Sequence, residues 1–175
     1  MGQAARHLLP IGDGTLKPVL VLGIGNILLR DEGIGVRVVE ALSGVALGDE
    51  VEVLDGGTSG ADLVDVLADR RRVIVIDAAD IDGPPGTVAR LDGDDLLARA
   101  GQAMSLHEIG LAESLLMARQ LGCPPREVIV FGVRTADTGV GLELSPLMAD
   151  LVPRLVQLVI RELAAADDPA GAPHR

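Results

Sequence analysis

The sequence predicts an α/β fold with a single doubly wound, mostly parallel sheet flanked by helices. Short apolar runs without polar alternation are typical of strands that are buried on both faces. Helical patterns lie between these runs, and strands that alternate with helices form parallel sheets. The 175 residues are 48% hydrophobic, which is enough to fill a core on both sides of such a sheet.

Each expected strand is an apolar run bounded by turn residues. The first, third and fifth are the most apolar, and the fourth is weaker because it follows a loop rich in proline and glycine. The second ends at Asp55 and a turn formed by Gly56 and Gly57. In chain order, the expected strands are residues 19–22, 51–54, 73–76, 87–91 and 128–133.

The expected helices have apolar residues on one face and recognisable ends. Asp31 is the expected N-cap of the first helix, and Ser145 followed by proline begins the last. Met117 is expected to point inward from the third, and Pro153 to kink or interrupt the last. In chain order, the expected helices are residues 32–42, 61–69, 106–121 and 146–159, the last continuing toward the tail.

One α/β domain is expected over residues 17–166. Residues 1–16 and 167–175 have no periodic pattern, so we expect a flexible leader and a flexible tail. We detect no internal repeat and no linker between them, and a monomer is expected.

Composition excludes several classes of function. The net charge of −11 and the single aromatic residue argue against nucleic-acid binding. The single cysteine rules out an internal disulfide and is typical of a reducing compartment. No apolar run approaches the roughly 20 residues that span a bilayer. The sequence therefore predicts a cytoplasmic protein without a membrane segment.

Residues 23–35 favour two interpretations. The glycine pair Gly23 and Gly25 after a strand resembles a dinucleotide fingerprint, but Leu28 stands where the third glycine belongs. Asp55 lies about 30 residues beyond Gly25, where such a fold could hold a ribose. Alternatively, the segment carries an acid to the mouth of the sheet, where α/β folds bind ligands.

Two carboxylates and one imidazole form a second candidate site. Glu32 follows the first strand and Asp77 ends the third, two strands that are commonly neighbours. With His107 they offer a donor set suited to a divalent metal. Each residue also has a simpler interpretation: a first-turn acid, a turn cap and a solvent-facing residue at a helix start, respectively.

Several segments, taken in order, resemble the motifs of the hydrogenase maturation endopeptidases. In that family, proline often follows the Gly-Val pair that corresponds to Gly132 and Val133, whereas Arg134 follows it here. The segments are 23–35 (GIGNILLRDEGIG), 55–58 (DGGT), Asp77 after its strand, 105–111 (SLHEIGL), 132–133 (GV) and 144–146 (LSP).

The resemblance implies an endopeptidase with a phosphorylase/hydrolase-like three-layer sandwich. Such an enzyme removes the C-terminal extension of the nickel–iron hydrogenase large-subunit precursor after nickel insertion. The resemblance implies that Glu32, Asp77 and His107 form the catalytic and metal-binding set, with Asp31 a weaker candidate ligand. Asp55, Gly56 and Gly57 would contribute to substrate recognition.

The resemblance implies no tightly held cofactor. The metal would be the substrate's nickel, although other divalent metals could occupy the site. Two alternatives stay open: a non-catalytic metallochaperone or docking protein that uses the same three residues, and a dinucleotide-binding oxidoreductase built on the glycine pair.

Overall fold

The computed structural model describes residues 16–58, 63–99 and 106–165. A five-stranded sheet in the order β2-β1-β3-β5-β4 forms its centre. The first four strands in this order are parallel, and β4 pairs antiparallel with β5 at one edge. The strands are β1 (Val19–Ile24), β2 (Val51–Gly57), β3 (Arg72–Ala78), β4 (Val88–Asp92) and β5 (Val128–Val133).

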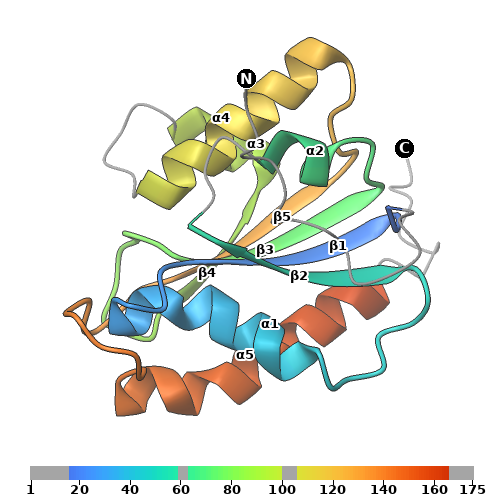
Figure 1. Ribbon diagram of the computed structural model, residues 1–175. Helices are drawn as coiled ribbons and strands as arrows, with labels where there is room; N and C mark the ends of the chain where they lie inside the picture. Colours follow the sequence, from blue (N-terminus) through green and yellow to red (C-terminus); the bar gives the residue numbers. More distant parts are fainter. Residues whose placement is uncertain (1–15, 59–62, 100–105, 166–175) are drawn as a thin grey trace, which may run out of the picture.

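Helices cover both faces of the sheet, so the predicted three-layer α/β architecture is confirmed. Figure 1 shows α1 and α5 on one face, and α2, α3 and α4 on the other. The helical elements are η1 (Arg30–Gly33, a 3-10 turn), α1 (Ile34–Leu42), α2 (Val64–Leu67), α3 (Gly93–Arg99), α4 (Leu106–Leu121) and α5 (Pro146–Ala165).

Alternate residues of each central strand supply the two hydrophobic cores. Val21 of β1 packs toward α1 and α5, whereas Leu20 and Leu22 pack toward α2 and α4. Burying one such aliphatic side chain stabilises the fold by roughly 1.5–3 kcal/mol. In β3, Val73 and Val75 belong to the α2 and α4 core. By this alternation, Asp77 lies on the same face of the sheet as these two valines.

Two predictions about helix ends and faces are wrong. Asp31 does not cap a helix; its carboxylate accepts hydrogen bonds from the segment after β5, because the chain enters α1 through the 3-10 turn. Met117 is 49% exposed, because the inward face of α4 is formed by Leu111 and Leu115 instead.

Two further differences concern α3 and α5. The sequence interpretation missed α3, which begins with a reciprocal cap: the N–H of Asp95 donates to Asp92 at 2.7 Å, and the N–H of Asp92 to Asp95 at 3.4 Å. In the described residues α5 continues through Pro153 without interruption. The buried stripe of Met148, Leu151, Leu155 and Val159 offsets the backbone hydrogen bond that proline removes.

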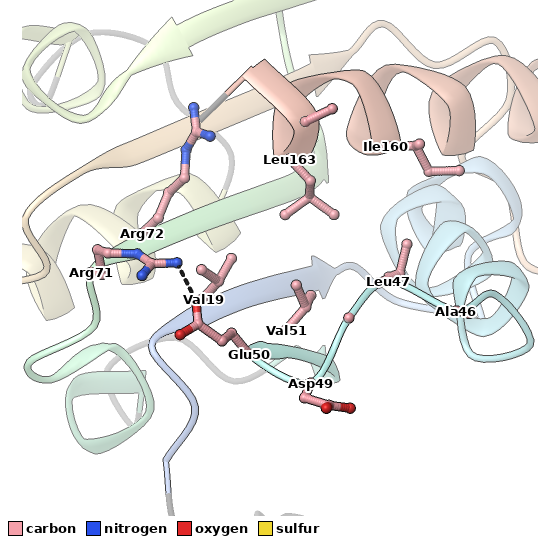
Figure 2. A pocket seen from close by; sticks show the side chains of 12 residues that line it. Val19, Ala46, Leu47, Asp49, Glu50, Val51, Arg71, Arg72, Ile160 and Leu163 are labelled. Atoms are coloured by element: carbon pink, nitrogen blue, oxygen red, sulfur yellow. Dashed lines mark hydrogen bonds and ion pairs between the residues drawn. The ribbon is translucent and has the colours of Figure 1, made fainter. Parts of the chain in front are cut away.

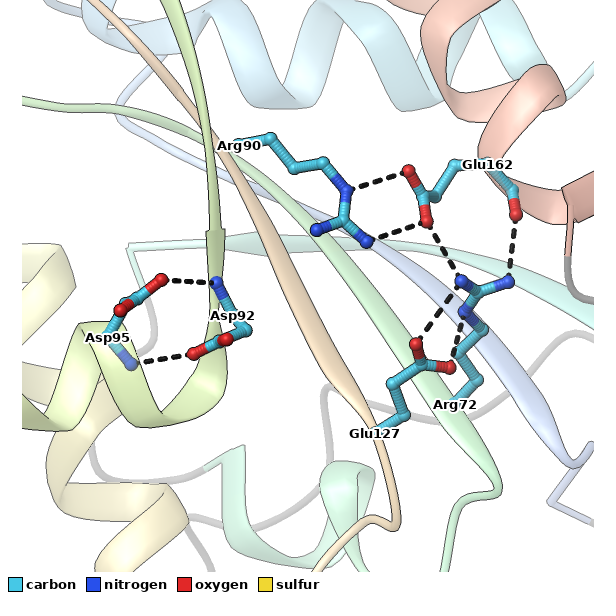
Figure 3. A network of polar contacts seen from close by, with 6 residues as sticks. All are labelled: Arg72, Arg90, Asp92, Asp95, Glu127 and Glu162. Atoms are coloured by element: carbon cyan, nitrogen blue, oxygen red, sulfur yellow. Dashed lines mark hydrogen bonds and ion pairs between the residues drawn. The ribbon is translucent and has the colours of Figure 1, made fainter. Parts of the chain in front are cut away.

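A network of ion pairs ties α5 to the sheet (Figure 3). Arg72 of β3 pairs with Glu127 at 2.8 Å and with Glu162 at 2.9 Å. Arg90 of β4 donates two hydrogen bonds to the same Glu162 carboxylate, each 2.9 Å long. These bonds, opposed by burial and assisted by the charges of Arg90 and Arg72, hold the pKa of Glu162 below its ordinary value.

The predicted tail, Ala166 at the predicted domain boundary and residues 1–15 of the predicted leader lie outside the described residues; Leu16, the last residue of the leader, is described. The domain bounds at residues 17 and 166 therefore stay predictions. Among the helices that the structure describes, none has the length and low charge required to cross a bilayer.

Candidate functional site

Glycines bring the segment after β1 into close contact with β3. A Cβ at Gly35 would lie 2.2 Å from the carbonyl oxygen of Ile76 and 2.3 Å from that of Ile24. Gly25 has a φ of +148°, and a Cβ there would lie 1.9 Å from the carbonyl oxygen of Glu32. Only glycine permits these approaches. Gly25, one of the two glycines that resembled a nucleotide loop, therefore allows the chain to pack against itself.

Glu32 lines a cleft of about 350 Å³ at the carboxyl ends of β3 and β5. The order of the strands reverses between β1 and β3, because β1 lies between β2 and β3. In open α/β sheets, ligands bind beside such a reversal, at the carboxyl ends of the strands. The side chain is partly exposed, so it can meet a ligand. The other lining residues are Ala78, Ala79, Asp80, Arg134, Thr135, Ala136 and Thr138.

Asp77 lies at the end of β3 that borders this cleft. It is the penultimate residue of β3, it is 1% exposed, and its neighbour Ala78 lines the cleft. β1 and β3 are neighbours, as predicted, and η1 contacts β3, so the structure brings Glu32 and Asp77 to one edge of the sheet.

His107 is the second residue of α4, and its side chain is outside the described part of the structure. Figure 1 shows that α4 begins at the edge of the sheet where β1, β3 and β5 end. This helix covers the face of the sheet to which Asp77 belongs. The backbone position of His107 therefore agrees with a place beside Asp77.

Asp31 is fully buried next to Glu32 and organises the loop after β5. One carboxylate oxygen accepts N–H bonds from Ala136 at 3.0 Å and Asp137 at 2.7 Å, and the Ser145 hydroxyl at 2.9 Å. The other accepts the N–H of Ser145 at 2.7 Å. The predicted cap by Ser145 is present too, since its hydroxyl accepts the N–H of Met148 at 3.4 Å. Asp31 is thus a clamp between the loops of the cleft.

Asp55 and its glycines lie at the end of β2, an edge strand. The Asp55 carboxylate accepts the N–H of Gly57 at 2.7 Å, and Gly57 has a φ of +53°. The strand extends further than predicted because β1 and β2 keep pairing past an irregularity at Gly23. Asp55 is not among the described residues that line the cleft, so its role in recognition stays a prediction.

The segment after β5 supplies cleft residues that sequence reasoning missed. Arg134 lines the cleft and forms an ion pair with Asp80. Thr135 and Thr138 line the same wall. The rule that selected Asp77, a polar residue after a buried parallel strand, would also have selected Arg134.

Asp137 and Arg30 join the segment after β5 to the segment after β1. Their side chains form an ion pair at 2.7 Å. The N–H of Gly139 is the main cause that lowers the pKa of Asp137; burial opposes this effect, and Arg30 lowers the pKa further. Asp137 is therefore a stable anion whose charge is already partnered, which favours a structural role over proton transfer.

A second cavity of about 670 Å³ lies at the opposite edge of the sheet, where the strands begin (Figure 2). Its walls are largely aliphatic and include Val19, Val51 and Leu163, with Arg71 and Glu50 paired at 2.8 Å. It contains none of the predicted site residues. Ligands of open α/β sheets bind at the carboxyl ends of the strands, so the smaller cleft is the better candidate site.

The chemistry of the smaller cleft depends on oxygen donors. Within the described residues, no group of three histidine, cysteine or acidic side chains is placed to hold a metal. Glu32 and Asp77 contribute carboxylates at one edge, and a histidine from α4 would complete a mixed set with open positions. Such a set can bind a metal that brings other ligands of its own.

Comparison with known proteins gives a consistent result. Residues 36–162 match the family model described as hydrogenase maturation protease. The chain is 38% identical over 161 residues to the hydrogenase 2 maturation protease of Escherichia coli, covering 89% of this chain and 98% of the relative. It is 38% identical over 149 residues to the hydrogenase expression/formation protein HupD of Thiocapsa roseopersicina, covering 83% and 67%.

The fold is similar to that of a solved structure as well. The hydrogenase maturating endopeptidase HybD from E. coli superposes with a TM-score of 0.80 at 36% identity. The match covers 85% of this chain and 93% of that one. The similarity therefore extends over the whole sheet and the helices on both of its faces.

Proposed function

Because this chain belongs to the hydrogenase maturation protease family, whose members process the hydrogenase large subunit, we propose a specific form of that activity. The enzyme removes the C-terminal extension of the nickel–iron hydrogenase large-subunit precursor once nickel is inserted. It recognises the nickel, which belongs to the substrate, through Glu32, Asp77 and His107.

One observation carries this proposal: Glu32 and the end of β3 meet at a single cleft. Glu32 lines the cleft, Asp77 is buried at the end of β3 that borders it, and His107 is the second residue of α4, which begins at the same edge of the sheet. This placement supports a single site built from residues that are 45 and 30 positions apart in the sequence. The set contains one histidine and no thiolate, so its affinity for a free metal would be modest, and the precursor's own ligands would supply the rest.

The proposed chemistry follows from this placement. A precursor without nickel offers nothing for the three residues to bind, so it would not be held in position for cleavage. In a loaded precursor, the nickel can polarise a carbonyl or activate a water near the scissile bond. A carboxylate of the set can then serve as the general base. This chemistry requires no resident cofactor. The proposed location of the enzyme is the cytoplasm, where it would encounter the precursor.

The test compares nickel-loaded and nickel-free precursor by mass spectrometry of the products. We expect peptide release from the loaded precursor only. His107→Ala and Glu32→Gln should each slow peptide release about a hundredfold or more. A hundredfold is about the lower limit of the rate that a general acid or base usually contributes. His7→Ala, which changes a histidine of the predicted leader, is the matched control and should cleave at the normal rate.

Two results would contradict the proposal. Equal cleavage of both precursors would remove nickel recognition, and full activity of His107→Ala would remove the three-residue site. A stable complex with the loaded precursor but no peptide release would favour the alternative of a non-catalytic docking protein.

A further inference from the structure

We propose that four exposed apolar side chains beside the cleft form a docking platform for the folded body of the large-subunit precursor. The inference rests on the proposed function and adds where the protein substrate is held. The platform consists of Ile27 (39% exposed), Leu28 (58%), Val140 (86%) and Leu142 (61%).

The four side chains come from two loops that are joined to each other. The N–H of Gly141 donates to the carbonyl of Leu28 at 2.9 Å, and the N–H of Arg30 donates to the carbonyl of Gly141 at 3.0 Å. Val140 and Leu142 flank Gly141 in the chain, so they lie beside Leu28. Figure 1 shows the loop after β5 passing next to the segment after β1.

Both loops are held in place before any partner arrives. The buried Asp31 carboxylate accepts four hydrogen bonds from residues on both sides of Val140 and Leu142: two from Ala136 and Asp137 before them, and two from Ser145 after them. Arg37 of α1 donates to the carbonyl of Leu142 at 2.8 Å. A platform that is already ordered loses little conformational entropy on binding, so its apolar area contributes more fully to affinity. A merely solvent-facing loop has no need of a buried clamp.

The position of the platform identifies its occupant as the precursor. Thr138 lines the cleft only two residues before Val140, and Glu32 lines it four residues after Leu28. A protein whose C-terminal region enters the cleft must therefore cover the platform. The cleft of about 350 Å³ holds a short peptide segment, so most of the contact with a large substrate lies outside it. Rigid exposed apolar side chains are typical of such contacts.

The matched test uses three leucine variants of the full-length enzyme. Leu28→Ser and Leu142→Ser alter the platform, whereas Leu121→Ser alters an equally exposed leucine (67%) at the far end of α4. Binding of the nickel-loaded large-subunit precursor from the same organism is measured by calorimetry, and cleavage is measured separately. We expect Kd and KM to rise about tenfold for each platform variant, with kcat unchanged, and no change for Leu121→Ser.

Val140→Glu provides a second test that does not depend on the fold of the leucine variants. A carboxylate at an 86% exposed position leaves the fold intact but must be desolvated on docking, so we expect at least tenfold weaker binding. Equal binding by Val140→Glu and wild type would overturn the platform. So would a wild-type dimer that Leu142→Ser dissociates, because the occupant would then be a second copy of this chain.

Failure of the proposed function is distinguishable from failure of the platform. If the wild type binds but does not cleave the precursor, the protease activity fails while the binding comparison still judges the platform. If the wild type cleaves and all variants bind equally, the platform alone fails.

Discussion

The two edges of the sheet both bury charged groups but satisfy them differently. At the carboxyl edge, the Asp31 carboxylate is held by backbone N–H groups and one hydroxyl, which are neutral donors. At the amino edge, buried arginines are paired with glutamates: Arg70 with Glu52 at 2.7 Å, and Arg72 with Glu127 and Glu162.

This difference distinguishes the candidate binding site from ion pairs that only stabilise the fold. Neutral donors stabilise a carboxylate without cancelling its charge, so the carboxyl edge keeps negative charge beside Glu32 and Asp77. Such an edge supports the proposed contact with the nickel of the precursor. At the amino edge each arginine charge is cancelled, and the paired groups only join α5 and β2 to the rest of the fold.

The strongest test of the carboxyl edge is Asp31→Asn. The amide retains one acceptor oxygen and places an NH₂ group against a donor, so at least one buried N–H loses its partner. We expect the free energy of unfolding to fall by about 4 kcal/mol, measured by urea denaturation. Asp137→Asn, which alters an exposed ion pair, should cost under about 1 kcal/mol. Equal losses would show that Asp31 is not the clamp.

Gly35→Ala tests whether the close approach of α1 to β3 builds the site. The new Cβ would contact two backbone carbonyls, which cannot move aside as side chains do. We expect a loss of about 3 kcal/mol in the free energy of unfolding, with a lower cleavage rate as η1 shifts. Gly44→Ala is the control, because a Cβ there meets nothing within 4 Å. A stable, fully active Gly35→Ala enzyme would contradict this account.

Arg72→Met tests the amino edge. It leaves Glu162 with one arginine partner instead of two, so we expect a loss of about 2 kcal/mol in unfolding free energy. The cleavage rate should not change, because Arg72 begins β3 and the cleft lies at its other end. Arg71→Met breaks only an exposed pair and should cost under about 0.5 kcal/mol. Reduced cleavage by a folded Arg72→Met enzyme would show that the two edges are not independent.

The smallest expected effect is the pH dependence that comes from Glu162. Its pKa is lowered in the folded state, so its contribution to stability is present above the ordinary value of 4.5 and is lost as the pH falls through the lowered pKa. Glu162→Gln should therefore show a weaker loss of stability between about pH 5 and pH 3 in urea titrations. Identical acid profiles for the variant and the wild type would contradict this assignment.

Most of the architecture could be predicted because it depends on local patterns. The buried strands were recognisable from their uninterrupted apolar residues, and the neighbouring positions of β1 and β3 followed from the usual topology. Strand ends also identified Glu32 and Asp77, which the structure brings to one edge. The α3 helix escaped notice because its signal is a pair of aspartates, and such residues are common in loops.

The sequence by itself determined the α/β class, the edge of the sheet that carries the acids, and the family to which the chain belongs. Only the tertiary structure decided what Asp31 and Glu32 each do. The two neighbours are chemically alike, and nothing in their order shows that one is buried and the other lines the cleft. The role of Asp31 depends on donors from residues 136–145, more than 100 positions away. Contacts at such separations arise only when the chain folds, so local patterns do not contain them.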